Sequence, residues 1–512
     1  MLSPLVWVLL FIVVYFLSWR RKKVNSLPPG PFAWPLLGNY VQMGIAHWKG
    51  ISLVEWYEQC KRDYGSVFTV WIGPMPVVMV VDYDVIHETF KMNGEPHNGR
   101  QKAFVFTGYR EKMGLIWSDG DGWQEQRRFS LRVLRDFGFG RNIMQQRILE
   151  EISYRFERLD RELESVPHGK LEFRPTPFLD VLVGSVINKI LVGYRYDDHN
   201  IEELRKLKGG LDMQLDALSP VDVVVFYEST YQLPLFKQRY DVVATPQVEI
   251  IEHLRGLIEK RRKAIQEGTH VIDRAEGAED YIDAYLMEMQ RREEDGEPMG
   301  YFSDKWMAAN LLDLFFGGTE TSISSLLWAF LFIMRKPEIQ EKLRAEVLRT
   351  TGGNRCVEIT DKANMPYANA VVTETLRCSN IVTFNILHET TTESVVGGFK
   401  IPTGTVIVPQ MSVAMRDKTH FENPLEFNPD RYLDPENGKQ LEKKVIPFSV
   451  GKRACLGESL ARAEIFLFLT NFVQRYKFSP VPGQALDLRP IALATNLNRT
   501  RPYVMMLEKF HL

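Results

Sequence analysis

The chain has 512 residues, with 63 basic and 65 acidic side chains and a formal net charge of −2. This balance excludes a global charge that would attract nucleic acid. Hydrophobic residues make up 45% and charged residues 25%, the proportions of a globular protein with a large core. The four cysteines contain no C-x-x-C pair, which argues against a disulfide framework and a structural zinc site.

An apolar, uncharged run from Leu2 to Trp19 is followed at once by four basic residues, Arg20 to Lys23. Its length is near the lower limit for a membrane-spanning helix. A cleavable signal peptide would have its basic residues before the apolar part. Because they lie after it, the short N-terminus should be luminal and the body cytosolic. We expect residues 1–23 to be a transmembrane signal anchor, with a cleaved signal peptide or a core helix as the alternatives.

A proline-rich hinge, residues 24–35, follows the anchor, and its stiff centre is Leu27–Pro31. No later linker or repeat divides the chain, so residues 36–512 should form one body. Within it, Val67–Ile72 and Val77–Val81 are rich in β-branched residues and predict a hairpin.

A basic helix is predicted to begin at Trp123, with Arg127 one turn later on the same face. Taken alone, this pair also fits a solvated helix face that carries a tucked tryptophan. The pattern by itself leaves both interpretations open.

The segment Ser303–Arg335 has no proline and predicts a helix of about 50 Å. A second membrane span is the alternative, but polar residues interrupt the apolar run and favour a buried core helix. These residues are Asn310, Asp313, Thr319, Glu320, Thr321, Ser322, Ser324 and Ser325.

Two glycines, Gly317 and Gly318, stand in the middle of this helix just before Glu320 and Thr321. Paired glycines weaken a helix and can open a local bulge. The Thr321 hydroxyl can turn to a carbonyl one turn back. The plain alternative is a kink with an acid at the surface.

A further helix is predicted around Tyr367–Arg377, with Glu374 along a largely apolar face and Arg377 three residues on. An isolated ion pair of this kind contributes little to stability.

Near the C-terminus, Phe448–Gly457 places Cys455 between two glycines and just before an apolar helical pattern. Small residues allow the backbone to come close to a partner. The N-terminus of the following helix favours negative charge on the sulfur. The loop could therefore present one thiolate to a flat metal cofactor; the alternative is a buried structural cysteine.

The pattern Phe-x-x-Gly-x-Arg-x-Cys-x-Gly in this loop resembles the haem-binding signature of the cytochrome P450 monooxygenases. Essentially the whole chain is similar to the animal microsomal enzymes usually called family 2. The resemblance implies a mainly α fold with a smaller β-rich part near residues 64–82 and 381–410. It also implies haem b, held by Phe448 and Gly457 in the loop, with Cys455 as the axial ligand of the iron.

The same resemblance assigns roles to residues elsewhere. Contacts to the haem propionates are implied for Arg100, Trp123, Arg127, His388 and Arg453. Proton delivery is implied for Thr321 and Glu320, and a structural ion-pair latch for Glu374, Arg377 and Arg431. The segment 378–387, which lines the pocket in relatives, departs from the family because it lacks the usual prolines.

The implied reaction inserts one oxygen atom of O2 into a lipophilic small molecule: a fatty acid, a steroid or a xenobiotic. No G-x-G-x-x-G follows a strand, so the electrons should come from a separate NADPH-cytochrome P450 reductase, with cytochrome b5 as a possible helper. The protein would lie in the endoplasmic reticulum (microsomal) membrane as a single-pass protein. Two alternatives stay open: a rearranging haem-thiolate enzyme, such as a hydroperoxide or prostanoid isomerase, and a non-catalytic haem-bound carrier or sensor.

Overall fold

The structure is a computed structural model that describes residues 26–137, 142–219, 221–222, 226, 228–273, 277–491 and 497–510. The expected membrane anchor, residues 1–23, and the first two residues of the hinge lie outside the described residues. The rest of the hinge can be followed into the body.

The hinge is docked on the first strand of the body. Thr69 donates its hydroxyl to the carbonyl of Pro28 (2.8 Å) and its backbone N–H to that of Pro29 (2.9 Å). A Cβ at Gly30 would lie 1.9 Å from the Thr69 carbonyl oxygen, so this close approach requires glycine. The hinge therefore leaves the body in a fixed direction.

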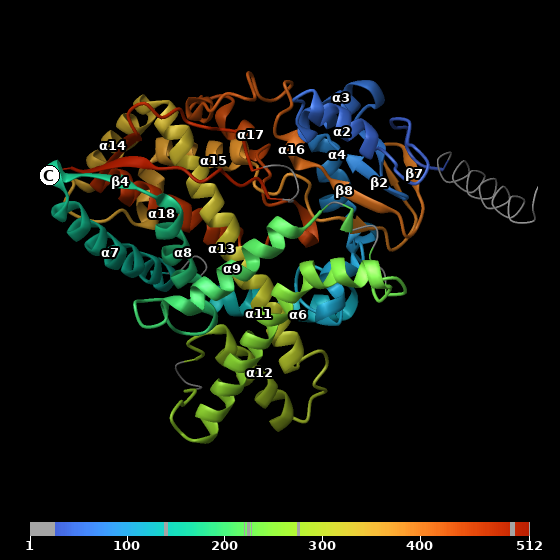
Figure 1. Cartoon of the computed structure of the whole chain (residues 1–512), viewed down its shortest axis with the longest axis horizontal. Helices are drawn as coiled ribbons and strands as arrows, with labels where there is room; N and C mark the ends of the chain where they lie inside the picture. The colour runs from blue at the N-terminus through green and yellow to red at the C-terminus, as the bar shows by residue number, and fades with distance from the viewer. Residues whose placement is uncertain are drawn as a thin grey trace, which may run out of the picture.

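Helices make up most of the described chain (Figure 1), which confirms the mainly α class. The α-helices are α2 Tyr40–Trp48, α3 Leu53–Tyr64, α4 Tyr83–His87, α5 Phe104–Thr107, α6 Gly120–Asp136, α7 Asn142–Ser165, α8 Pro175–Leu191, α9 Ile201–Ala217, α11 Pro234–Gln266, α12 Tyr281–Glu294, α13 Asp304–Arg335, α14 Pro337–Thr351, α15 Pro366–Ser379, α16 Met411–Ala414, α17 Gly438–Lys443 and α18 Glu458–Arg475. Short 3-10 or π turns are η1 Glu88–Met92, η2 Glu95–His97, η3 Gly108–Arg110, η4 Pro167–Gly169, η5 Ile359–Asn364, η6 Pro429–Tyr432 and η7 Gly451–Arg453.

The strands form three small sheets. They are β1 Val67–Ile72, β2 Met75–Val80, β3 Gly99–Arg100, β4 Lys170–Phe173, β5 His388–Glu389, β6 Ser394–Val396, β7 Phe399–Ile401, β8 Val406–Pro409, β9 Tyr476–Pro480 and β10 Met505–Lys509. The largest sheet has the order β1-β2-β8-β5-β3, in which only β2 and β8 are parallel. The expected β-rich regions are thus present, and β4-β10-β9 adds a sheet that the sequence did not predict.

The first hairpin is tighter than expected. Ile72 pairs with Met75, so Gly73 and Pro74 alone form the turn. Gly73 has a φ of +59°, a conformation that two-residue hairpin turns need and that glycine adopts without strain. The second strand therefore begins two residues before Val77.

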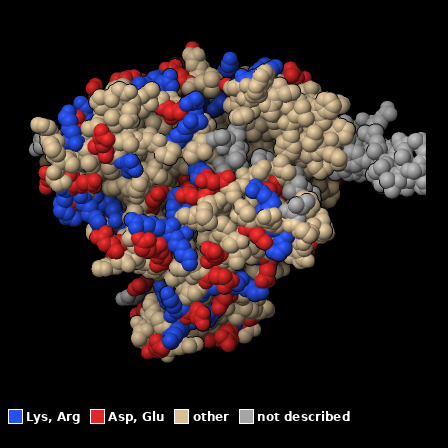
Figure 2. All heavy atoms as spheres, in the orientation of Figure 1, with Lys and Arg blue, Asp and Glu red and all other residues tan. Residues whose placement is uncertain are grey.

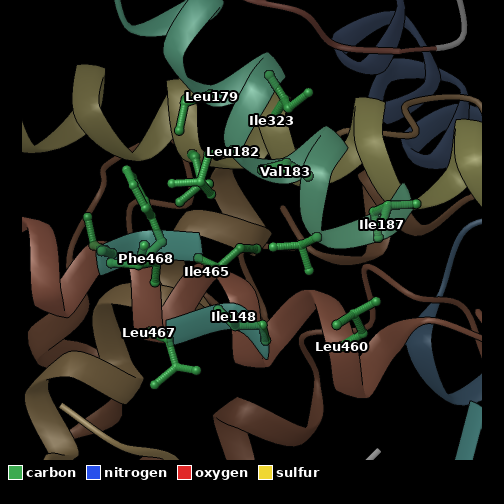
Figure 3. Close-up of a cluster of buried hydrophobic side chains, with 14 of the residues drawn as sticks. Ile148, Leu179, Leu182, Val183, Ile187, Ile323, Leu460, Ile465, Leu467 and Phe468 are labelled. Carbon is green, nitrogen blue, oxygen red and sulfur yellow. The ribbon is translucent and has the colours of Figure 1, made fainter. Parts of the chain in front are cut away.

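Helix α13 crosses the core, as predicted, and Ser303 caps it by accepting a hydrogen bond from Trp306 N (3.3 Å). Among the described helices it alone is long and apolar enough to cross a membrane, and 72% of its most apolar window is buried in the protein. Figure 3 shows the core where α8 and α18 meet, with Ile323 of α13 beside Leu182 and Val183 of α8. These contacts fix α13 against α8.

The two glycines of α13 have different uses, and the helix runs through both without the expected bulge. A Cβ at Gly318 would lie 2.7 Å from Ile187 Cδ1, so this glycine lets α8 pack closely. A Cβ at Gly317 would meet no atom within 4 Å, because Gly317 faces a cavity. Packing against α8, which no local pattern reveals, therefore explains Gly318 but not Gly317.

Candidate functional site

A cavity of about 850 Å³ lies between α13 and the cysteine loop. Its lining is mainly apolar and comes from parts of the chain far apart in sequence: α2, α3, the segment around residues 115–117, α8, α9, α13, residues 381–387 and the start of α18. A space of this size and character suits a bulky lipophilic ligand or cofactor.

The cysteine loop forms one wall of this cavity. Gly451 has a φ of +79°, and a Cβ there would lie 1.8 Å from the carbonyl oxygen of Phe90. The backbone N–H of Cys455 donates to the carbonyl of Phe448 (2.8 Å), which closes the loop. Phe448, Cys455 and Gly457 all line the cavity.

The surroundings of Cys455 raise the pKa of its thiol overall. Protein atoms around the side chain raise the pKa of the thiol by desolvation, whereas the N–H of Gly457 and the guanidinium of Arg127 lower this pKa. The exposed surface of Cys455 faces the cavity rather than bulk solvent. A metal cation there would offset the desolvation and hold the sulfur as a thiolate.

Three arginines border the same part of the cavity. Arg100 donates Nε to the carbonyl of Ile116 (3.0 Å), and Arg453 donates Nε to that of Asn98 (2.8 Å). Arg127 donates to the carbonyl of Ala454, beside the cysteine. These bonds to neutral carbonyls orient the three guanidinium groups without neutralising them.

This positive cluster fits an anionic partner. Burial and the repulsion from Arg100 lower the pKa of Arg453 to about 8, and burial and the repulsion from Arg127 lower that of Arg100 to about 9. Both terminal nitrogens of Arg453 are buried without a partner among the described residues. The two carboxylates of a haem would satisfy these donors, so the residues present fit that cofactor.

Trp123 and His388 stand behind the cluster rather than on the cavity wall. The indole N–H of Trp123 donates to the carbonyl of Leu115 (3.1 Å), and its ring packs 3.4 Å from the guanidinium carbon of Arg453. His388 donates Nδ1–H to the carbonyl of His97 (2.7 Å), and burial lowers its pKa. In this arrangement Trp123 orients Arg453, and the neutral His388 keeps Nε2 as an acceptor.

On α13, Thr321 lines the cavity and donates its hydroxyl to the carbonyl of Gly317 (2.6 Å), as expected. Glu320 does not share this face. It is 2% exposed and paired with Lys208 of α9 (3.0 Å), and burial raises its pKa while Lys208 opposes the rise. Neighbouring helix residues point in different directions, so the Glu320 carboxyl lies against α9 while the Thr321 hydroxyl faces the cavity.

A different carboxyl group, which the sequence did not predict, reaches the cavity. Glu464 of α18 is 4% exposed and accepts a hydrogen bond from the Ser322 hydroxyl (2.9 Å). Burial raises its pKa to about 8, and its second oxygen has no partner among the described residues. The sequence feature that could have identified Glu464 is a single acid within the apolar helix pattern that follows the cysteine loop.

The latch forms as predicted. Glu374 accepts two bonds from Arg377 (2.8 Å each) and one from Arg431 Nε (3.1 Å), and Tyr432 adds its hydroxyl (2.7 Å). The side chains of Glu374 and Arg377 are both 0% exposed. Burial opposes ionisation, but Arg377 and Arg431 bring the pKa of Glu374 below its ordinary value.

The proline-poor segment after α15 uses asparagines for its turns. Asn380 and Asn385 both have a φ of +41°, which asparagine tolerates better than most side chains. Asn385 also donates to the carbonyl of Pro409 (3.1 Å), and Gln410 donates to that of Thr383 (2.6 Å). These bonds hold residues 381–387 against β8, where they line the cavity.

The cavity, the thiol and the arginine cluster are the parts of a haem-thiolate centre, and the family comparison agrees. Residues 28–505 match the family model for cytochrome P450. The chain belongs to the cytochrome P450 family, and it is therefore a monooxygenase with a haem iron bound by a cysteine thiolate.

Similar proteins match over nearly the whole length. Mouse (Mus musculus) cytochrome P450 2B19 is 31% identical over 482 residues, 93% of this chain and 93% of its own. Rat (Rattus norvegicus) cytochrome P450 2F2 is 31% identical over 494 residues, 96% and 95% of the two chains. Human (Homo sapiens) cytochrome P450 2A13 is 33% identical over 485 residues, 94% and 93%.

Proposed function

We propose that the protein binds haem b with Cys455 as the axial ligand and oxidises a lipophilic small molecule. The observation that carries the proposal is that Cys455 and the unneutralised cluster of Arg100, Arg127 and Arg453 border one apolar cavity. When bound, the thiolate-ligated haem supplies the activation of O2. The protein's own residues bind the cofactor and the substrate, orient them and supply protons.

The arginine cluster would hold the two haem propionates. Arg453 has two unused donors, and Trp123 packs against its guanidinium group, so the fork is already oriented. Phe448 and Gly457 would form the floor under the flat ring, with Cys455 between them in the loop. Apart from Cys455, the proposed iron ligand, these residues act by positioning the cofactor.

Proton delivery would use Thr321 and a buried acid. The Thr321 hydroxyl gives its hydrogen to Gly317, so its oxygen lone pairs are left to accept a bond from water in the cavity. Glu464, with its pKa near 8, holds a proton at neutral pH next to Ser322, one residue after Thr321. We therefore propose Glu464, in addition to Glu320, as an acid for this step.

The electron donor would be a separate NADPH-cytochrome P450 reductase, with cytochrome b5 as an accessory donor. The substrate would be a fatty acid, a steroid or a xenobiotic, because the cavity is mainly apolar.

The protein would be attached to the endoplasmic reticulum membrane through residues 1–23, with the body in the cytosol. Near the hinge, large apolar side chains are exposed: Phe32, Trp34, Leu36, Leu37, Ile45 and Trp48. Figure 2 shows few charged side chains over that end of the molecule, where α2 and α3 lie in Figure 1. An apolar surface beside the anchor suits contact with lipid.

The test is reconstitution of the haem-loaded protein with the reductase, NADPH and a panel of fatty acids, steroids and xenobiotics. We expect NADPH consumption that is coupled to an oxygenated product.

Thr321→Ala should keep haem and NADPH consumption but divert electrons to peroxide, because water in the cavity loses its acceptor. Product formation without reductase would contradict the proposal and favour a rearranging enzyme; binding without any turnover would favour a carrier.

A further inference from the structure

Two glutamine side chains line the cavity from the helices that cover it: Gln214 on α9 and Gln247 on α11. They are 6% and 2% exposed. The amide nitrogen of each is buried and finds no hydrogen-bond partner in the described part of the chain. A buried amide without a partner is destabilising and rare in native proteins. A ligand in the cavity would supply the missing hydrogen bonds of this pair.

The two glutamines lie close along one helix seam. Helices α9 and α11 run antiparallel, because Glu203 contacts His253 (3.1 Å) while Gly210, further along α9, packs beside Pro246, earlier in α11. Extending this pairing toward the end of α9 puts residue 242 opposite Gln214, so Gln247 lies five residues from that point, about 7.5 Å along the axis. Both side chains can therefore reach the same end of one bound molecule.

The charges around the cavity decide what kind of molecule fits. Arg110 lines the cavity too, but Asp313 neutralises it, and Asp313 also accepts the N–H groups of Leu115 (2.6 Å) and Ile116 (2.9 Å). The other lining arginines are those that we assign to the haem propionates. Among the described lining residues, a carboxylate ligand would find no spare arginine at this wall, whereas a neutral oxygen needs only the two amides.

We infer that Gln214 and Gln247 bind the ketone or alcohol oxygen of an otherwise hydrocarbon substrate and select it over plain hydrocarbons and carboxylates. The last torsion of glutamine is broad, so each amide can turn either its N–H2 group or its carbonyl oxygen to the ligand. This inference rests on the proposed monooxygenase function, because it takes the cavity as the substrate site.

Equilibrium dialysis of the haem-loaded full-length protein tests the selection with matched probes. The pairs are androstanone with androstane and tetradecanone with tetradecane, and tetradecanoic acid is the charged probe. We expect each ketone to bind about tenfold more tightly than its hydrocarbon, which corresponds to about 1.4 kcal/mol. The acid should bind more weakly than tetradecanone.

Gln214→Met and Gln247→Met keep the side-chain length and remove the amide. Each should lower the ketone-to-hydrocarbon affinity ratio about threefold, and the double variant should bring it to about one. Their thermal midpoints should not fall, because the unpaired amide is gone. The control Leu218→Met changes an apolar residue of the same wall and should leave the ratio as it is.

Equal binding of ketone and hydrocarbon in both pairs, no binding of either ketone, or an unchanged ratio in the double variant would overturn the inference. Turnover is read separately in the reductase assay. Loss of the ketone preference with intact turnover refutes the glutamine site alone. A ketone preference without turnover refutes the proposed monooxygenase function alone.

Discussion

Arg453 shows at the scale of one residue how the site is prepared for an anion. Its Nε is bonded to the carbonyl of Asn98, while both terminal nitrogens are buried without a partner in the described structure. Trp123 packs against one face of the guanidinium, and burial with the repulsion from Arg100 lowers its pKa to about 8. Such an arrangement is costly in the empty protein and becomes favourable when carboxylates arrive.

Cys455→Ala tests the ligand at this scale. The variant should give no red-shifted Soret band in the reduced carbon monoxide complex, because that band requires a thiolate on the iron. Optical spectra of the haem-reconstituted variant measure the position of the Soret band. The control is Cys378→Ala, because Cys378 lies outside the cavity lining. A red-shifted band retained by Cys455→Ala would contradict the assignment.

Glu464→Gln tests the buried acid through the pH dependence of stability. The pKa of Glu464 is about 8 in the folded protein, above its ordinary value of 4.5. The contribution of Glu464 to folding stability is therefore fully present at pH below its ordinary pKa and is lost as pH rises through about 8. Denaturant unfolding should show the variant gaining stability relative to the parent between about pH 5 and about pH 9.

Ser322→Ala serves as the matched comparison, because it removes the hydrogen bond and keeps the carboxyl group. The Ser322 hydroxyl lowers the pKa of Glu464, so in this variant the loss of stability should move to higher pH. A parent and a Glu464→Gln variant with parallel pH profiles would show that Glu464 is ionised in the folded protein.

At the scale of elements, α13 joins the oxygen side of the cavity to the core. Gly317 leaves room toward the cavity, whereas Gly318 lets Ile187 of α8 come close. Thr321 and Ser322 then stand at the cavity, with Ser322 bonded to Glu464 of α18. The position of Thr321 therefore depends on how closely α8 and α18 pack against α13.

Gly318→Leu should disturb this packing. A Cβ at this position already falls 2.7 Å from Ile187 Cδ1, so the larger side chain should cost about 1–3 kcal/mol in the free energy of unfolding. Denaturant unfolding measures the loss, and Ile187→Ala in the same chain should recover part of it by making room. Gly317→Ala is the control, because no atom lies within 4 Å of its added Cβ. Equal effects at the two glycines would refute the packing argument.

At the scale of the whole molecule, the latch joins α15 to the long irregular segment before the cysteine loop. Arg377 donates to the carbonyls of Met415 (3.0 Å) and Pro424 (2.8 Å), while Arg431 and Tyr432 hold Glu374 from η6. One buried carboxylate thus ties together chain segments more than 50 residues apart. The segment that the latch holds at η6 precedes the cysteine loop in the chain.

Glu374→Gln should leave Arg377 and Arg431 without their counter-charge. Because Arg377 is buried, the expected cost is about 3–5 kcal/mol in the free energy of unfolding, together with weaker haem retention. Thermal unfolding and the haem-to-protein ratio measure both effects. Glu202→Gln removes an exposed ion pair with Arg205 and should change stability by less than about 1 kcal/mol. A loss as small as that of the control would refute the latch.

Local patterns predicted the elements that carry their own signals. The β-branched runs predicted β1 and β2, the proline-free length predicted α13, and the spacing of Glu374 and Arg377 predicted their ion pair. The sheet of β4, β9 and β10 was missed, because these short strands become stable only when β10 pairs with β9 and also with β4, more than 300 residues earlier in the chain.

The sequence by itself determined the family, the mainly helical class and the loop with Cys455, because these depend on residue types at fixed spacing along the chain. Only the tertiary structure decided which side chains share the cavity. It turned Glu320 toward Lys208, brought Glu464 from another helix to Ser322, and placed the amides of Gln214 and Gln247 on the opposing helices. Such neighbours depend on the directions of side chains and the packing of helices, which spacing in one segment does not contain.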